Sequence, residues 1–318
     1  MTFIASIIAK EGVAMVADSF VTAVEQSIDL DSFVDYLDST KNKNSISISD
    51  ILTLFKKHPS HTRNFADKLF MFDEYSAITT TGLAYINQKE IKDIVKSIAT
   101  EMQVDKSVYY ARDVEDVIKE FCDKIKVEIV QHLKERDFGD TAFIFSHFNR
   151  KENKPQAFHI QINQLTKGDY DISSSDIITY QDRSYLKILT DGQSGFVERL
   201  IFGSLYKNVT EIKKQFIDYI LKTFKPNKGK KKAIIDYIKD FEFLRETVQD
   251  DVFSLKFREL SLQEAVDLAA LLVKITMDIQ VYTEKVPTVG GLIRLAIISK
   301  EKGFEWISGN KIASSKII

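Results

Sequence analysis

The first nineteen residues constrain the fold of this chain most, because they form the pattern of a buried β-hairpin. Residues 3–9 and residues 13–17 are two short apolar runs, and the charged turn of residues 10–12 separates them. Short apolar runs bounded by a turn are typical of buried strands. A hairpin reverses the chain, so Asp18, at the end of the second run, is predicted to lie beside Thr2, at the start of the first.

Thr2 is a candidate nucleophile if Met1 is removed, which its small side chain permits. The freed α-amine can then act as the base for the threonine's own hydroxyl. An α-amino group has an ordinary pKa of about 7.7–8.0, which lies near working pH, where acid–base catalysis is most efficient. The start of the chain is therefore compatible with hydrolysis of an amide bond.

Five further segments accompany this start in a fixed order. They are residues 67–72 (DKLFMF), 78–84 (ITTTGLA), 192–195 (GQSG), 260–265 (LSLQEA) and 289–307, which end in GFEWI. Together with residues 1–22 they resemble the proteasome-type β subunits and their bacterial relatives, which are N-terminal-nucleophile hydrolases. The resemblance covers about half of the chain.

The pattern of apolar residues predicts strand pairs alternating with helices. Strands are expected near residues 3–9, 13–18, 68–72, 76–81, 142–148, 156–162, 185–190, 292–299 and 304–307. Helices are expected near residues 85–101, 113–135, 195–206, 210–223, 232–247 and 261–281. This order predicts an α+β protein, and the resemblance implies a four-layer αββα sandwich of two mainly antiparallel sheets. We expect one domain over residues 1–318.

Two insertions, at about residues 23–63 and 207–259, exceed what the resemblance accounts for. The first holds an acidic piece at residues 29–36 and an amphipathic piece at residues 50–57. The second is mainly helical in pattern and has a basic turn at residues 228–232. That turn is not a phosphate-binding loop, because no strand precedes it and no Gly-Lys-Ser/Thr pattern is present. Both insertions are expected to decorate the mouth or the outer face of the fold.

The resemblance assigns catalytic roles to residues at matching positions. Thr2 would attack, the Lys68 ammonium would lower the pKa of the α-amine, and Asp18 would orient Lys68. Gly82 would supply a backbone N–H to the oxyanion. Ser194 would support the amine, although a serine before a helical pattern is also a common N-cap.

A supporting acid after the late helix is harder to assign. Residues 277–291 are longer than the corresponding family segment and lack a clean Asp-x-x-Ser pattern. Asp278 is the preferred equivalent, and Glu284 and Thr288 are alternatives.

The resemblance also implies how substrate would bind. The main chain at Thr22 would pair with an extended peptide as an added strand. Val21, Thr80 and Ala84 would line the pocket for the residue before the cut. Thr80 suggests a pocket of medium size.

Bulk properties exclude several classes of function. The net charge of −2 gives no general attraction to nucleic acid or to anionic membranes. No apolar run approaches the roughly 18 residues that span a bilayer, and no secretion signal is visible, so a cytoplasmic location is expected. The single Cys122 fits a reducing compartment, as a buried structural thiol. The five histidines lack partners in a metal-binding pattern, so we expect no metal and no cofactor.

Three functions remain open at this stage. The first is a threonine-type peptidase that forms a homo-oligomeric ring and degrades unfolded polypeptide, with an AAA+ ATPase unfoldase as the partner that the resemblance implies. The second is a non-peptidase N-terminal-nucleophile amidohydrolase that cuts an amide in a small molecule or a peptide-like conjugate. The third is a catalytically inactive scaffold subunit of a ring.

Overall fold

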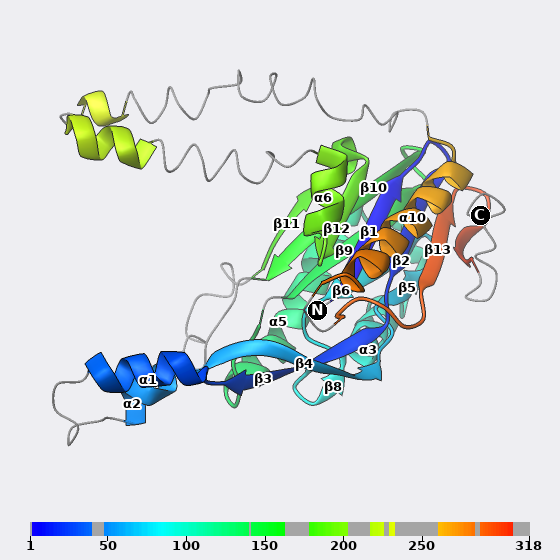
Figure 1. Ribbon diagram of the computed structural model, residues 1–318. Helices are drawn as coiled ribbons and strands as arrows, with labels where there is room; N and C mark the ends of the chain where they lie inside the picture. The colour runs from blue at the N-terminus through cyan, green and yellow to red at the C-terminus, as the bar shows by residue number, and fades with distance from the viewer. Residues whose placement is uncertain are drawn as a thin grey trace.

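The computed structural model describes residues 2–39, 48–139, 141–162, 178–202, 217–225, 229–232, 260–283 and 287–307. The protein is α+β, with two five-stranded sheets in which all the strand pairings are antiparallel, and with helices packed against them (Figure 1). Within the described residues, no helix has the length and apolar character needed to cross a bilayer.

The first sheet contains the predicted N-terminal hairpin. Its strand order is β12-β1-β2-β13-β14. The strands are β1 (Phe3–Ile8), β2 (Gly12–Ala17), β12 (Ile188–Gly192), β13 (Arg294–Ser299) and β14 (Gly303–Trp306). Because β1 pairs with β2 from Ile4 opposite Ala17 to Ile8 opposite Val13, the hairpin prediction is confirmed.

The second sheet has the strand order β11-β10-β9-β6-β5. Its strands are β5 (Leu69–Asp73), β6 (Ser76–Thr81), β9 (Thr141–Asn149), β10 (Lys154–Ile162) and β11 (Ile178–Asp182). The sequence pattern did not predict β11, because this edge strand is mostly exposed and carries no apolar run. The strand expected near residues 185–190 begins only at Ile188, after a 3₁₀ turn at Ser184–Leu186.

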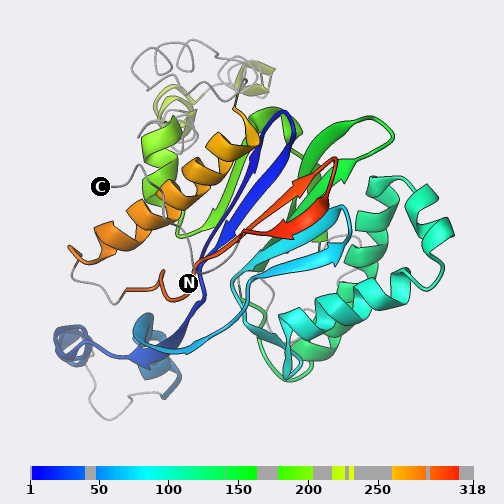
Figure 2. The same cartoon turned by 90° about the vertical axis from the view of Figure 1, so that its right-hand side faces the viewer.

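Helices cover the outer face of each sheet, as Figure 2 shows. The helices α6 (Gly195–Phe202) and α10 (Leu262–Gln280) pack on the first sheet. The helices α3 (Ile91–Met102) and α5 (Val114–Leu133) pack on the second sheet. The short helix α4 (Lys106–Ala111), which was not predicted, connects α3 to α5.

The central strands are buried on both faces, which explains their continuous apolar runs. In β1, the side chains of Phe3, Ala5 and Ile7 belong to the cluster under α6 and α10. Ile4 and Ile8, which alternate with them, belong to the cluster between the two sheets. The layers are therefore, in order, α6 with α10, the first sheet, the second sheet, and α3 with α5.

Three helix predictions need correction or completion. The helix expected from residue 85 begins at Ile91, because the small strands β7 (Tyr85–Ile86) and β8 (Lys89–Glu90) form a hairpin before it. Of the helix expected near residues 210–223, the structure describes residues 217–224, which are helical. The third helix was expected near residues 232–247, and residues 233–247 lie outside the described residues.

The first insertion forms an arm that extends away from the sheets (Figure 1). Its strands β3 (Phe20–Ser27) and β4 (Lys56–Phe65) pair as a ribbon. Its helices α1 (Leu30–Ser39) and α2 (Ile48–Thr53) lie at the far end. The sequence pattern missed both strands, because β4 is polar throughout most of its length and contains Pro59, and the register shifts twice in β3.

Cys122 lies in α5 within the core between that helix and the second sheet. Burial raises the pKa of its thiol to about 12. Because the thiolate is the reactive form of cysteine, this location favours the structural role expected from the sequence.

Candidate active site

Thr2 stands directly before β1 and is almost fully buried, with 2% of its surface exposed. Its backbone carbonyl accepts a hydrogen bond of 2.6 Å from the Gln193 N–H. The next residue, Phe3, pairs with Gly192 of β12. Thr2 is therefore held by the backbone of the turn between β12 and α6.

Gly192 permits this close approach of two backbones. Its φ is +80°, and a Cβ built on it would stand 1.9 Å from the carbonyl oxygen of Thr2. Only glycine adopts this conformation without a steric penalty. The glycine of the GQSG segment therefore has a structural reason, which is to seat Thr2.

We predict that Gly192→Ala lowers the free energy of unfolding by at least about 2 kcal/mol, because it combines a left-handed backbone with a clash. Urea unfolding followed by circular dichroism measures the change. Gly195→Ala is the matched control, since a Cβ there meets no atom within 4 Å and should leave stability nearly unchanged. Equal stability of the two variants would show that Gly192 does not fix the position of Thr2.

Asp18 follows β2 and is fully buried beneath the start of β1. One carboxylate oxygen accepts a hydrogen bond of 3.1 Å from the Phe3 N–H. The other accepts bonds from the N–H groups of Phe20, at 3.2 Å, and Gly290, at 3.1 Å. The carboxylate thus binds three separate segments of backbone together.

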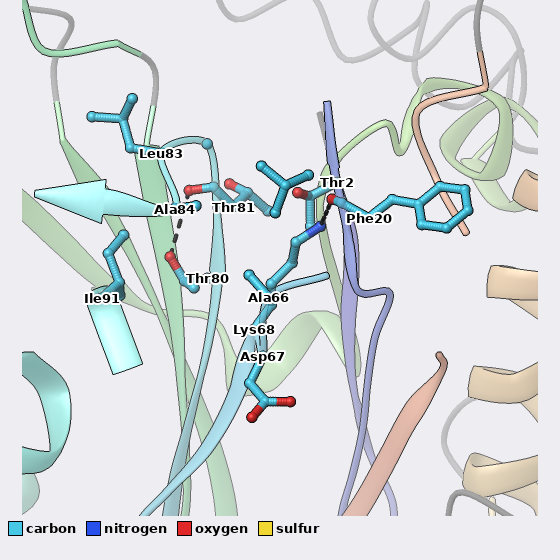
Figure 3. A pocket seen from close by; sticks show the side chains of 12 residues that line it. Thr2, Phe20, Ala66, Asp67, Lys68, Thr80, Thr81, Leu83, Ala84 and Ile91 are labelled. Carbon is cyan, nitrogen blue, oxygen red and sulfur yellow. Dashed lines mark hydrogen bonds between the residues drawn. The ribbon is translucent and has the colours of Figure 1, made fainter. Parts of the chain in front are cut away.

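Lys68, the residue before β5, extends from the second sheet toward the first. Its ammonium lies 2.9 Å from a carboxylate oxygen of Asp18 and donates to the carbonyl oxygen of Phe20 at 2.6 Å. Figure 3 shows the Lys68 side chain directed toward Phe20 and Thr2. The side chain of Lys68 is 8% exposed and that of Asp18 is 0% exposed, so the ion pair is shielded from water.

Burial controls the pKa of both partners. Burial lowers the pKa of Lys68, and the Asp18 carboxylate opposes that shift. Burial raises the pKa of Asp18, against the charge and hydrogen bond of Lys68 and the N–H groups of Gly290 and Phe3. Each group therefore depends on the other to remain charged, as expected for a buried ion pair.

A small pocket of about 40 Å³ opens beside this pair. Six of the residues predicted from the sequence line it, namely Thr2, Val21, Lys68, Thr80, Gly82 and Ala84. Asp18 joins them through its contact with Lys68. The structure thus brings together residues separated by up to 82 positions in the chain. Gly82, at the end of β6, has a φ of +88°, a conformation that favours glycine.

The two remaining predicted residues on this side occupy defined places. Thr22 lies in β3 opposite Thr62, and the structure describes its backbone but not its side chain. Ser194 is buried directly before α6, and its hydroxyl donates to the carboxylate of Glu198 in the first turn of that helix. The Glu198 N–H in turn donates to the Ser194 carbonyl oxygen at 2.7 Å. Ser194 therefore organises the helix start next to the turn that holds Thr2.

Asp278 is not brought to the pocket by any contact of the described residues. It lies exposed on α10 and pairs with Lys274 on the same helix. Of the alternatives, Glu284 lies outside the described residues. Thr288 is buried, and its N–H donates to the Gln280 side chain at 2.7 Å. Gly290, whose N–H donates to Asp18, follows Thr288 by two residues. Thr288 is therefore closer in sequence to this contact of the site than Asp278 is.

A partly buried network that the sequence did not predict joins the two sheets at this end. Asp191 of β12 lies 2.6 Å from the Nε2 atom of His159 on β10. Its other oxygen accepts a hydrogen bond of 3.2 Å from the hydroxyl of Thr81 on β6, which lines the pocket. The acidic residue immediately before the GQSG segment was the only signal in the sequence. The network therefore connects β12, which leads into the turn that holds Thr2, with β6, which ends directly before Gly82.

Although burial opposes it, the hydrogen bond and charge of His159 hold the pKa of Asp191 below its ordinary value, with help from Gly192 and Thr81. A depressed pKa means that the charged carboxylate stabilises the folded state. This contribution is present above the unfolded pKa of about 3.9 and is lost as the pH falls through the folded value.

We therefore predict that Asp191→Asn lowers the free energy of unfolding by about 1.5–3 kcal/mol at pH 7, because the hydrogen bonds at this position no longer involve a charged group. The difference from the wild type should shrink as the pH falls below about 4. Denaturant unfolding at neutral and acidic pH measures both values. A difference that stays constant over this range would show that the charge of Asp191 contributes nothing.

The arrangement suits chemistry by a hydroxyl nucleophile in a shielded site. Three residues line the same small pocket: Thr2 carries a hydroxyl, Lys68 carries a buried ammonium, and Gly82 forms a turn. The described residues contain no group of three or more His, Cys, Asp or Glu side chains placed to hold a metal ion. No protein-family model matches the chain, and a search of curated proteins finds no similar sequence.

Proposed function

We propose that this protein is an N-terminal threonine hydrolase that cuts peptide bonds after removal of Met1. One observation carries the proposal: the buried Lys68–Asp18 pair lies at the pocket that Thr2 lines, although the three residues come from distant parts of the chain. The layer order supports it, because it agrees with the αββα sandwich of the N-terminal-nucleophile hydrolases that the sequence resembles.

In the proposed reaction the free α-amine of Thr2 takes the proton from the Thr2 hydroxyl, directly or through one water. The hydroxyl oxygen attacks the carbonyl carbon of the scissile bond, and the N–H of Gly82 stabilises the oxyanion. The C–N bond then breaks, and the ammonium of Thr2 returns the proton to the leaving amine. Water hydrolyses the resulting ester by the same route and restores the hydroxyl.

Lys68 and Asp18 prepare the amine for this role. An ammonium beside the α-amine disfavours protonation of the amine and lowers its pKa. Asp18 holds Lys68 in place and is itself held by three backbone N–H groups. The base is therefore expected to be neutral at physiological pH.

An extended substrate would run between the start of β3 and the segment that follows β6. Val21 of β3 and Thr80 and Ala84 on the opposite side line the pocket between them. Unpaired strand edges accept extended peptides by main-chain hydrogen bonds. We extend the proposal to a homo-oligomeric ring in the cytoplasm that takes unfolded polypeptide, with an AAA+ unfoldase as the partner.

The decisive experiment combines the intact mass of the purified protein with its reactivity toward an epoxyketone, which needs both the hydroxyl and the free amine. We expect a mass lower by one methionine residue and a single covalent adduct on Thr2. Retention of Met1 in every preparation, with no adduct, would favour the inactive scaffold instead.

A second candidate is an amidohydrolase that acts on a small molecule. The pocket of about 40 Å³ and the presence of Phe20 and Val21 of the arm on its wall favour this alternative, since an arm can restrict entry to small ligands. Degradation of an unfolded chain such as casein would favour the peptidase. Turnover of small amides alone, by a protein that forms no large ring in light scattering, would favour the amidohydrolase.

A further inference from the structure

The far end of the arm exposes apolar side chains that no other described part of the protomer covers. We define the arm tip as residues 29–39 and 48–55, and neither of its helices has a buried residue. Its large exposed apolar side chains are Leu30 (71%), Val34 (44%), Ile48 (76%), Leu52 (62%) and Phe55 (37%). Clustered exposure of this kind marks an interaction site more often than a solvated surface.

The apolar residues of α1 form one stripe of that helix. Leu30 and Val34 are four residues apart and therefore share a face. Asp31, Asp35 and Asp38 form a parallel stripe one position further along. The arm tip contains five aspartates and no lysine or arginine, and the exposed Lys56 follows it at the start of β4. The acidic stripe of α1 therefore lies directly beside its apolar stripe.

These helices are too short to be stable without support. α1 has 10 residues and α2 has 6, whereas isolated helices shorter than about 12–15 residues are marginal in water. Inside the tip, a hydrogen bond of 3.5 Å from Tyr36 to Asp50 joins the two helices. A partner that covers Leu30 and Val34 would supply the missing burial.

A second segment of the same chain has the complementary character. Two described stretches of the second insertion, residues 217–225 and 229–232, contain five lysines and one aspartate. The helix of residues 217–224 exposes Tyr219 (64%) and Phe224 (72%). Lys222 and Lys225 are exposed beside them, and so are the lysines of residues 230–232. We call residues 217–225 and 229–232 together the basic segment.

We propose that the arm tip of one copy of this chain docks on the basic segment of a second copy. The apolar side chains of both surfaces would be buried against each other, and the aspartates of α1 would face the lysines. Figures 1 and 2 place the arm tip and the helix of residues 217–224 at separate ends of the molecule. A contact between copies therefore joins the two surfaces without moving either across the body of the protomer.

The symmetry of this contact has a consequence for assembly. Because different surfaces meet, the interface is head-to-tail, and each copy retains one free surface of each kind. Such contacts close into rings when the rotation between copies permits and otherwise continue as filaments. The inference does not rest on the proposed hydrolase activity, because an inactive subunit would assemble in the same way.

Charge reversal of each surface tests the proposal, with mass measured by light scattering after size exclusion. We expect Asp31→Lys/Asp35→Lys/Asp38→Lys to weaken self-association at least about tenfold, and Lys230→Glu/Lys231→Glu/Lys232→Glu to do the same, since close charge pairs across an interface contribute about 1.5 kcal/mol or more. A chain that carries both reversals should recover assembly, because its surfaces are complementary again. Wild-type assembly should weaken between about 50 and 500 mM salt, over which screening increases.

A matched control reverses three exposed acids on the body, with Asp123→Lys/Asp267→Lys/Glu301→Lys, and should leave the mass unchanged. The proposal is overturned if the wild type is a monomer of 36.4 kDa, including one whose two surfaces meet within a single chain. It is also overturned if either reversal keeps the wild-type mass, or if the doubly reversed chain remains dissociated, as expected when a different partner binds the arm tip. Circular dichroism of each variant confirms that it is folded.

Discussion

Replacing Thr2 by alanine will reduce hydrolysis by at least about 10⁴-fold, because the variant has no hydroxyl to attack the substrate. The measurement is the release of a fluorophore from a peptide amide at saturating substrate, together with the degradation of an unfolded protein. The fold should survive, since the contact that seats Thr2 uses its backbone carbonyl and not its side chain. Unfolding in urea should therefore change little.

Thr2→Ser separates the chemistry from the packing. Serine retains the hydroxyl and the α-amine, so this variant should retain measurable hydrolysis and react with the epoxyketone, whereas Thr2→Ala should do neither. Thr100→Ala is the control for loss of a threonine elsewhere, because Thr100 is exposed on α3 and its hydroxyl donates to the Lys96 carbonyl oxygen of the same helix. If Thr2→Ala retained wild-type hydrolysis, the proposed nucleophile would be wrong.

The pattern of apolar residues predicted the strands that are buried on both faces. The apolar runs of β1 and β2 are continuous because α10 covers one face and the second sheet covers the other. The start of α10 was predictable for a different reason. Ser261 and Glu264 form a capping box there, and this arrangement has a local sequence signature.

The arm could not be predicted in the same way. Its strands β3 and β4 pair mainly with each other, outside the two large sheets, so neither strand needs an apolar face to join a core. Edge and ribbon strands carry little of the alternation that identifies half-buried strands. The edge strand β11 escaped prediction for the same reason.

The hairpin pattern placed Asp18 beside the start of β1, but the rest of the site was predictable only through the resemblance. Asp18 and Lys68 are 50 residues apart in the chain, and no local pattern indicates that they meet. Asp278 was chosen by analogy with a segment that is longer here, and it lies exposed on α10. The contact between Asp191 and His159 crosses from one sheet to the other, and the acidic residue before the GQSG segment does not by itself identify its partner.

Replacing Lys68 by methionine will abolish hydrolysis and lower the free energy of unfolding by about 3–5 kcal/mol, because it leaves the buried carboxylate of Asp18 without its cation. The three backbone N–H groups that Asp18 accepts from would remain, but they carry no full positive charge. The pKa of Asp18 should rise further above its ordinary value, so protonation of the carboxyl in acid should relieve part of the loss. Urea unfolding at pH 7 and at pH 5 measures that difference.

The pair can be tested as a unit by adding Asp18→Asn to Lys68→Met. The double variant has no buried charge at this position, so it should be more stable than Lys68→Met alone while remaining inactive. Lys92→Met is the matched control, because Lys92 forms a salt bridge with Asp67 but is 47% exposed, and loss of such a pair costs at most about 1 kcal/mol. If Lys68→Met were no less stable than Lys92→Met, the ion pair at the pocket would not be the shielded contact on which the proposed mechanism depends. If the double variant were active, the base of the reaction would not need an ammonium beside it.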